Sequence, residues 1–140
     1  MSTPLPRLSL TLLPEVLAVS RLHPDASTPP WAERPGALCS ITRTREEVSI
    51  VCAQPAVPPD ALAERGFRAL AVAGPLAFSA TGVLASLALP LWEAGVSLFV
   101  LSTYDTDYVL VKDEQLERAL EALARAGHSL HSWREPPEIT

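Results

Sequence analysis

The chain has 140 residues and a formal net charge of −5, with 11 Lys and Arg against 16 Asp and Glu. This length fits one domain or two small domains that share a core, and an acidic chain without clustered basic residues argues against DNA or RNA as a partner. No apolar run approaches the roughly eighteen residues needed to cross a bilayer and the N-terminus lacks a secretory signal pattern, so we expect a cytoplasmic protein without a membrane partner.

The first half of the chain is rich in proline and in strand-forming residues. Residues 7–22 (RLSLTLLPEVLAVSRL) predict one bent strand or two short strands, because Pro14 interrupts the pattern. The proline-rich residues 23–36 predict a loop without a helix. Residues 38–53 predict a β-hairpin, with its turn at Arg45 and Glu46.

This first hairpin places two cysteines opposite each other. If its turn has two residues, paired positions sum to 91, so Cys39 faces Cys52 and Ile41 faces Ile50. A facing pair allows a disulfide or a metal site. A cytoplasmic protein favours two buried thiols instead, and no nearby His completes a zinc site.

The second half predicts a complete set of elements. A short helix is expected over residues 58–66, with Gly66 as its end signal. The later elements are a strand at 67–73, an apolar helix at 82–94 that Pro90 bends, strands at 97–103 and 107–111, a helix that Asp113 caps and Gly127 ends, and a strand at 129–133.

The two halves resemble each other at an offset of sixty residues. LCSITRTREEVSIV from Leu38 aligns with LFVLSTYDTDYVLV from Leu98, and RLSLTLLPEVLA aligns with FRALAVAGPLAF at the same offset. This repetition predicts a duplicated βαββαβ unit. The first copy, residues 1–62, is degenerate because the proline-rich segment replaces its first helix, whereas the second copy, residues 63–140, is complete.

The turn SATGV before the apolar helix predicts a binding site. Ser79 and Thr81 bring hydroxyls to a helix N-terminus, where backbone N–H groups can hold a carboxylate or a phosphate. Asp107, at the start of the next hairpin strand, adds a negative charge. One positive and one negative element match the two ends of an amino acid. The alternatives are that the hydroxyls only cap the helix and that Asp107 only satisfies turn backbone groups.

The sequence gives no support for catalysis. The nucleophile elbow, the phosphate-binding loop and the dinucleotide-binding glycine pattern are all missing from it. The acidic pairs Glu46 with Glu47 and Asp105 with Asp107 lie on hairpin turns, without the apolar surroundings that raise a carboxyl pKa for acid–base work. We therefore expect no catalytic residue, no cofactor and no metal ion.

The second half resembles the ACT domain, a ferredoxin-like regulatory module that binds amino acids. The segments that carry the resemblance are Gly74-Pro75-Leu76, FSATGV from Phe78, EAGVS from Glu93 and LSTYDTDY from Leu101. The chain is similar to a tandem ACT family that includes the CASTOR-type cytosolic arginine sensors and small bacterial ACT proteins, and more distantly to the regulatory domains of aspartate kinases. Ser79 and Ala80 stand where the arginine sensors carry acidic residues, which argues against arginine as the ligand.

The resemblance implies an α+β fold of two ferredoxin-like ACT units, each with an antiparallel sheet and helices on one face. It implies a non-enzymatic allosteric module that senses a free amino acid at the interface of ACT units, with a homodimer or a regulated enzyme as partner. The alternative is a protein-interaction or dimerisation module with a vestigial pocket. The ligand-binding residues implied are Ser79, Thr81, Gly82, Val83, Thr103, Tyr104 and Asp107.

Overall fold

The computed structural model describes residues 4–33, 36–77 and 80–132, which fall into two compact units. Unit 1 comprises Met1–Pro14 with Ala69–Thr140, and unit 2 comprises Glu15–Arg68. Strand β5 (Ala63–Val72) begins in unit 2 and ends in unit 1. The first strand of the chain thus packs with the second half of the sequence. The predicted division into a degenerate first unit, residues 1–62, and a complete second unit, residues 63–140, stays a prediction.

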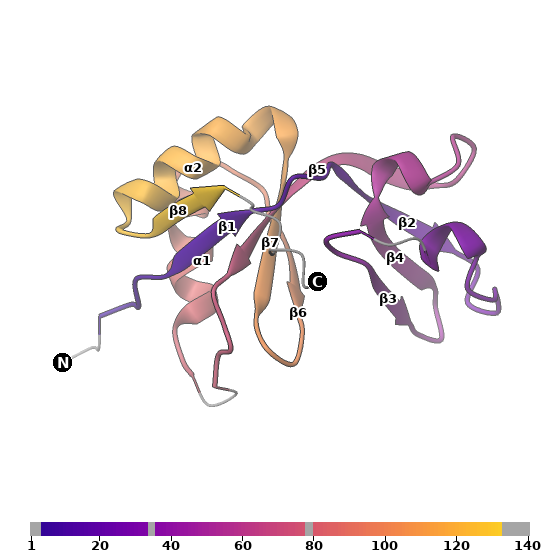
Figure 1. Ribbon diagram of the computed structural model, residues 1–140, viewed down its shortest axis with the longest axis horizontal. Coiled ribbons are helices and arrows are strands. Elements are labelled where there is room, and N and C mark those ends of the chain that lie inside the picture. Colours follow the sequence, from indigo (N-terminus) through magenta and orange to yellow (C-terminus); the bar gives the residue numbers. More distant parts are fainter. Residues whose placement is uncertain (1–3, 34–35, 78–79, 133–140) are drawn as a thin grey trace, which may run out of the picture. The chain divides into compact units, whose positions relative to one another are not determined.

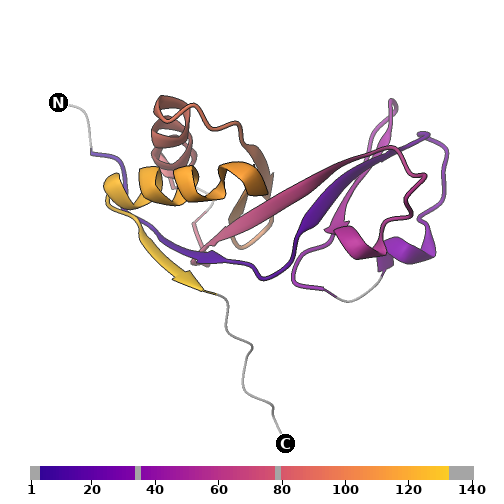
Figure 2. The same ribbon diagram turned by 90° about the horizontal axis from the view of Figure 1, so that it is seen from above.

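Unit 1 has a sheet with two helices on one face (Figures 1 and 2). The strand order is β6, β7, β5, β1, β8, in which β1 runs antiparallel to β5 and parallel to β8. This arrangement confirms the predicted α+β, ferredoxin-like fold. Its elements besides β5 are β1 (Ser9–Leu12), α1 (Val83–Glu93), β6 (Phe99–Ser102), β7 (Asp107–Lys112), α2 (Leu116–Arg125) and β8 (Ser129–Ser132).

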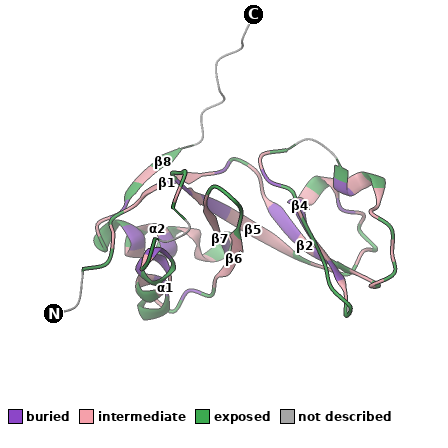
Figure 3. Ribbon diagram, turned by 90° about the horizontal axis from the view of Figure 1, so that it is seen from below, coloured by how far each residue is buried: buried purple, intermediate pink, exposed green. Residues whose placement is uncertain are grey.

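The core of unit 1 forms where the apolar sides of both helices meet the sheet. Leu87 and Leu91 of α1 and Leu123 of α2 are fully or almost fully buried there. Figure 3 shows that both helices have a buried and an exposed side. The spacing of Leu116, Leu120 and Leu123 along α2 is that of a helix with one apolar face, and this packing stabilises it more than its intrinsic propensity does.

His128 connects three elements of unit 1. Its Nδ1 accepts a hydrogen bond from the Leu8 N–H at 3.0 Å, and its Nε2 lies 2.8 Å from the Ser86 carbonyl oxygen. That carbonyl would normally bond to the N–H of residue 90, but Pro90 has none. The Leu8 N–H can only donate, so Nε2 carries the ring proton and donates to Ser86. His128 is thus a buried side chain that supplies the missing donor of α1.

Unit 2 is an antiparallel sheet in the order β3, β4, β2, β5. Its strands besides β5 are β2 (Leu17–Leu22), β3 (Ser40–Arg43) and β4 (Val48–Ala53), and short 3₁₀ turns lie at Pro30–Glu33 and Gln54–Ala56. Ile41 pairs with Ile50, which confirms the predicted hairpin register. Val48, Ile50 and Cys52 point to one side of β4 and form the core of the unit with Ala18, Ala32 and Val57.

The helix predicted at residues 58–66 is wrong. β5 already begins at Ala63, which pairs with Ser20 of β2, and Glu64 pairs with Val19. Only a few residues separate Pro59 from Gly66, too few to offset the cost of nucleating a helix. Pairing with β2 instead supplies partners for the same backbone groups.

Two smaller expectations also need correction. A 3₁₀ turn forms at Pro30–Glu33 within the expected loop, because proline is tolerated at the first position of a helix. Asp113 does not cap α2, since it opens a 3₁₀ turn, Asp113–Gln115, that precedes the helix. Trp133, the expected end of the last strand, lies outside the described residues.

Candidate functional site

A cavity of about 200 Å³ lies in unit 1 beside the β6–β7 turn. It is bordered by that turn, by the segment between β5 and α1, and by the first residue of α1. Its size suits a small metabolite better than a large ligand. The lining residues are Leu76, Ala77, Ala80, Val83, Ser102, Thr103, Tyr104, Asp105, Thr106 and Asp107.

Backbone and side-chain hydrogen bonds hold the β6–β7 turn in place. The Thr103 N–H donates to the Thr106 carbonyl at 2.8 Å, and the Thr103 hydroxyl oxygen accepts from the Thr106 N–H at 3.3 Å. The Thr106 hydroxyl donates to the Val72 carbonyl of β5 at 2.6 Å. The turn is therefore tied to the central strand before any ligand arrives.

The same turn also contacts the segment after β5. The Leu76 N–H donates to the Asp105 carbonyl at 2.7 Å. A Cβ at Gly74 would lie only 3.0 Å from that carbonyl oxygen, so glycine permits this close approach of two backbones. Two walls of the cavity are thus fixed to each other.

Asp107 is the first residue of β7 and faces Ser102 of β6. The Ser102 hydroxyl donates to Asp107 Oδ1 at 2.6 Å, which fixes the rotamer of the carboxylate at the edge of the cavity. A carboxylate accepts hydrogen bonds at both of its oxygens. The carboxylate can therefore accept a hydrogen bond from a ligand.

Helix α1 presents an uncapped N-terminus to this cavity. Gly82 is the N-cap residue, with φ of 80°, and among the described residues no side-chain cap hydrogen bond is made at this end of the helix. Val83, the first helical residue, lines the cavity. Uncapped N–H groups and the helix dipole make this end a favourable position for a carboxylate.

The structure brings together four of the seven residues predicted for the site. Val83, Thr103, Tyr104 and Asp107 line one cavity, whereas Thr81 and Gly82 precede the helix and do not line it. Ser79 lies outside the described residues. Sequence reasoning missed Ser102, although the hairpin register would have placed it opposite Asp107.

The electrostatic character of the cavity is asymmetric. Its described lining residues include the carboxylates of Asp105 and Asp107 but no Lys, Arg or His. The partial positive charge comes from the α1 N-terminus instead. A ligand with one anionic and one cationic group matches this distribution.

The part of the chain that the structure describes holds neither a metal-binding group nor a membrane span. No three His, Cys, Asp or Glu side chains gather into a metal-binding group within residues 4–33, 36–77 and 80–132. Over the same described ranges, every helix is too short or too polar to cross a bilayer.

The β3–β4 turn of unit 2 has the same hydrogen-bond pattern as the β6–β7 turn. The Thr44 N–H donates to the Glu47 carbonyl at 2.9 Å, as Thr103 does to Thr106. The Thr44 hydroxyl oxygen likewise accepts from the Glu47 N–H at 3.1 Å. The equivalent positions are 59 residues apart, one fewer than the offset at which the sequences align.

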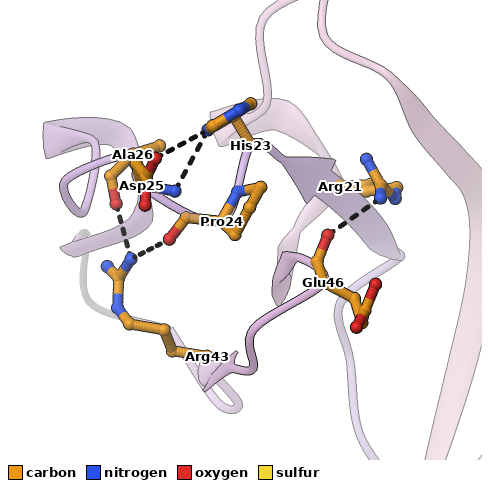
Figure 4. A network of polar contacts seen from close by, with 7 residues as sticks. All are labelled: Arg21, His23, Pro24, Asp25, Ala26, Arg43 and Glu46. Carbon is orange, nitrogen blue, oxygen red and sulfur yellow. Dashed lines mark hydrogen bonds and ion pairs between the residues drawn. The ribbon is translucent and has the colours of Figure 1, made fainter.

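In unit 2, an arginine takes the position that Ser102 has in unit 1. Arg43 Nη1 donates to the Pro24 carbonyl at 3.0 Å and to the Ala26 carbonyl at 2.7 Å (Figure 4). The guanidinium thus bonds to the loop that follows β2. The corresponding loop of unit 1, which follows β5, borders the cavity instead. Unit 2 satisfies these loop carbonyls with its own side chain.

Models of two known protein families match this chain, one in each half of the sequence. The family model of the ACT domain matches residues 62–125, and a second model, of an N-terminal domain, matches residues 15–60. The second match coincides closely with unit 2. A search of curated proteins finds no match to this chain.

Similar proteins are found among the solved structures. Protein Atu0741 from Agobacterium tumefaciens is 37% identical, with a TM-score of 0.86, over 96% of this chain and 99% of its own. VC0802 from Vibrio cholerae, described as a possible transport protein, is 20% identical, with a TM-score of 0.69, over 85% of this chain and 89% of its own. The regulatory subunit of aspartate kinase from Thermus thermophilus is 15% identical, with a TM-score of 0.60, over 87% of this chain and 99% of its own. The last two share the fold.

Proposed function

Because this chain belongs to the same family as Atu0741 and carries an ACT domain over residues 62–125, we propose that it is a regulatory module that binds a free amino acid. The observation that carries the proposal is the cavity that joins the uncapped N-terminus of α1 to the carboxylate of Asp107. These two elements complement the carboxylate and the ammonium group shared by all free amino acids. The proposal assigns no catalytic step to the chain.

Each end of the ligand has a defined partner in the proposed complex. The ligand carboxylate accepts hydrogen bonds from the N–H groups of the first turn of α1, beginning at Val83. The ligand ammonium donates to Asp107, whose Oδ1 is already held by Ser102. Thr103 and Tyr104 line the remaining side and set which ligand side chains fit.

A thermal-shift panel of the twenty amino acids, followed by calorimetry on any hit, tests the proposal. A ligand that binds only the folded state stabilises it by RT ln(1 + [L]/Kd), about 2.7 kcal/mol at a hundredfold excess over Kd. For a chain of this size, that gain raises the melting temperature by several degrees. A response to one amino acid or one chemical class supports the proposal, and a flat response across the panel refutes it.

The unit 2 counterpart of the site is not expected to bind the ligand. Arg43 already bonds to the loop carbonyls there, so the Arg43→Ala variant should bind the responding amino acid with a Kd within about twofold of the wild type. The exposed contacts that it loses are worth about 1 kcal/mol of unfolding free energy or less. Calorimetry and urea denaturation measure the two quantities. A tenfold loss of affinity would place the ligand at unit 2 instead.

Helix α1 favours a second candidate function, dimerisation with another copy of the chain. Leu84 is 48% exposed, Leu89 44% and Trp92 73%, and α1 has no charged residue before Glu93. An apolar helix face without charges is more typical of an interface than of a solvated surface. Sedimentation analysis should show a dimer that the Trp92→Glu variant dissociates. A wild-type monomer at all concentrations tested would reject this candidate.

A further inference from the structure

The two cysteines of unit 2 differ sharply in exposure. Both are free thiols, but Cys52 on β4 is only 4% exposed whereas Cys39, just before β3, is exposed. The expectation of two buried thiols is therefore correct for Cys52 and wrong for Cys39. Cys39 is therefore the residue of the pair that a reagent in solution meets first, although its Sγ lies in a partly buried hydrogen bond.

The hairpin register places the two cysteines opposite each other. Ser40 pairs with Val51 in β3 and β4, so the next pair along the same register is Cys39 with Cys52. Antiparallel pairs alternate between hydrogen-bonded and non-hydrogen-bonded types. The Thr44–Glu47 pair at the turn is hydrogen-bonded, which makes the Cys39–Cys52 position a non-hydrogen-bonded one.

Non-hydrogen-bonded pairs bring side chains closest together. Their Cα atoms are about 4.5 Å apart, which lies within the range of about 4.4–6.8 Å that disulfides span. The Cys39 thiol also donates to the Ala32 carbonyl at 3.0 Å, and Ala32 belongs to the same core cluster as Cys52. Both side chains thus lie on the face of the hairpin that covers this core.

The chemical surroundings of the thiols set the rate of their oxidation. Burial raises the pKa of the Cys52 thiol above its ordinary value, and the negative charges of Cys39 and Glu15 raise it further. Burial also raises the pKa of Cys39. Because the thiolate is the reactive form, oxidation is slow at neutral pH and faster in mildly alkaline solution.

We propose that Cys39 and Cys52 form a reversible disulfide when the chain meets a small-molecule disulfide. The Cys39 thiolate attacks the reagent, which gives a mixed disulfide and releases one thiol. The Cys52 thiolate then attacks the Cys39 sulfur and releases the second thiol. The two cysteines lose two electrons and two protons, and the reagent disulfide is reduced to two thiols.

The bridge would alter the environment of a second cavity. Cys52 borders a cavity of about 180 Å³ together with Trp31, Gly36, Leu38, Ala53, Pro55 and Ala56. Linking Cys52 to Cys39 fixes the end of β4 to the start of β3 and turns the Cys52 side chain toward that partner. The oxidation state of the thiols therefore controls one wall of this cavity.

The test equilibrates the full chain with mixtures of oxidised and reduced glutathione at a pH of about 8.5. The reaction is stopped with acid, and free thiols are then alkylated under denaturing conditions and counted by intact mass spectrometry. We expect one species that has lost two hydrogens, takes up no alkylating group and yields a linked Cys39–Cys52 peptide. The equilibrium constant for forming this disulfide from oxidised glutathione should be at least about a hundredfold larger in the folded chain than in urea, because folding holds the two thiols together.

Two single variants serve as controls. Cys52→Ser should accumulate glutathione on exposed Cys39, and Cys39→Ser should remain unmodified because Cys52 is buried. The proposal is overturned if the wild type retains two alkylatable thiols or carries glutathione on Cys39 with Cys52 still free. Disulfides between two chains, or an equilibrium constant no larger than in urea, would overturn it as well.

Discussion

Replacing Asp107 with Asn is expected to weaken binding of the responding amino acid by about 1.5–3 kcal/mol, roughly 10- to 150-fold in Kd. The carboxylate is the only partner proposed for the ligand ammonium, and Ser102 holds it in position. Asn keeps the size of the side chain and the contact with Ser102, but it removes the charge. Calorimetry on the two proteins measures the difference.

Asp105→Asn is the matched control for this prediction. Asp105 borders the same cavity from the same turn, so the variant removes an equal charge from nearly the same place. Its side chain is exposed, and its carbonyl, which holds Leu76, is unchanged. We expect less than about a threefold change in Kd, because exposed charges are well screened. Equal losses of affinity in the two variants would mean that Asp107 contributes only its negative charge to the cavity and no direct hydrogen bond to the ligand.

Replacing His128 with Ala is expected to lower the free energy of unfolding by about 3 kcal/mol. The substitution leaves the Leu8 N–H and the Ser86 carbonyl without their partner in a buried region. It also loosens the attachment of the residues just before β1. Urea denaturation of the variant tests this, and His131→Ala, on the exposed side of β8, should change stability by less than about 0.5 kcal/mol.

A double-mutant cycle with Pro90 identifies the cause of that loss. In a Pro90→Ala background, position 90 regains an N–H that can donate to the Ser86 carbonyl. Removing His128 should then cost about 1 kcal/mol less than in the wild type. If the cost is the same in both backgrounds, the imidazole does not replace the donor that Pro90 lacks.

Local patterns predict the parts of this fold that depend on neighbouring residues. The register of the first hairpin follows from a two-residue turn and one apolar face, and Ile41 does pair with Ile50. The bounds of α1 follow from an apolar run that starts after Gly82 and ends near Gly95. The turn, the helix start and Asp107 are close in sequence, so most of the candidate cavity could be predicted as well.

Long-range pairing explains what the sequence could not predict. Residues 63–66 (AERG) form part of β5 because β2 lies beside them, and this contact spans more than forty residues of sequence. The match between Pro90, which lacks a donor, and His128, which supplies one, also appears only when α1 and the end of α2 are packed together. Ser102 is different, because its contact with Asp107 is local and follows from the hairpin register.

The most direct test of amino-acid binding is a nuclear magnetic resonance titration of the ¹⁵N-labelled chain with an equimolar mixture of the twenty amino acids. The two hairpin turns, residues 44–47 and 103–106, share one hydrogen-bond pattern and serve as an internal comparison. Binding at the proposed site predicts saturable shifts of the amides of Val83 and of residues 103–107, while residues 44–47 remain unchanged. A spectrum without saturable shifts, or shifts confined to residues 44–47, would contradict the proposed site.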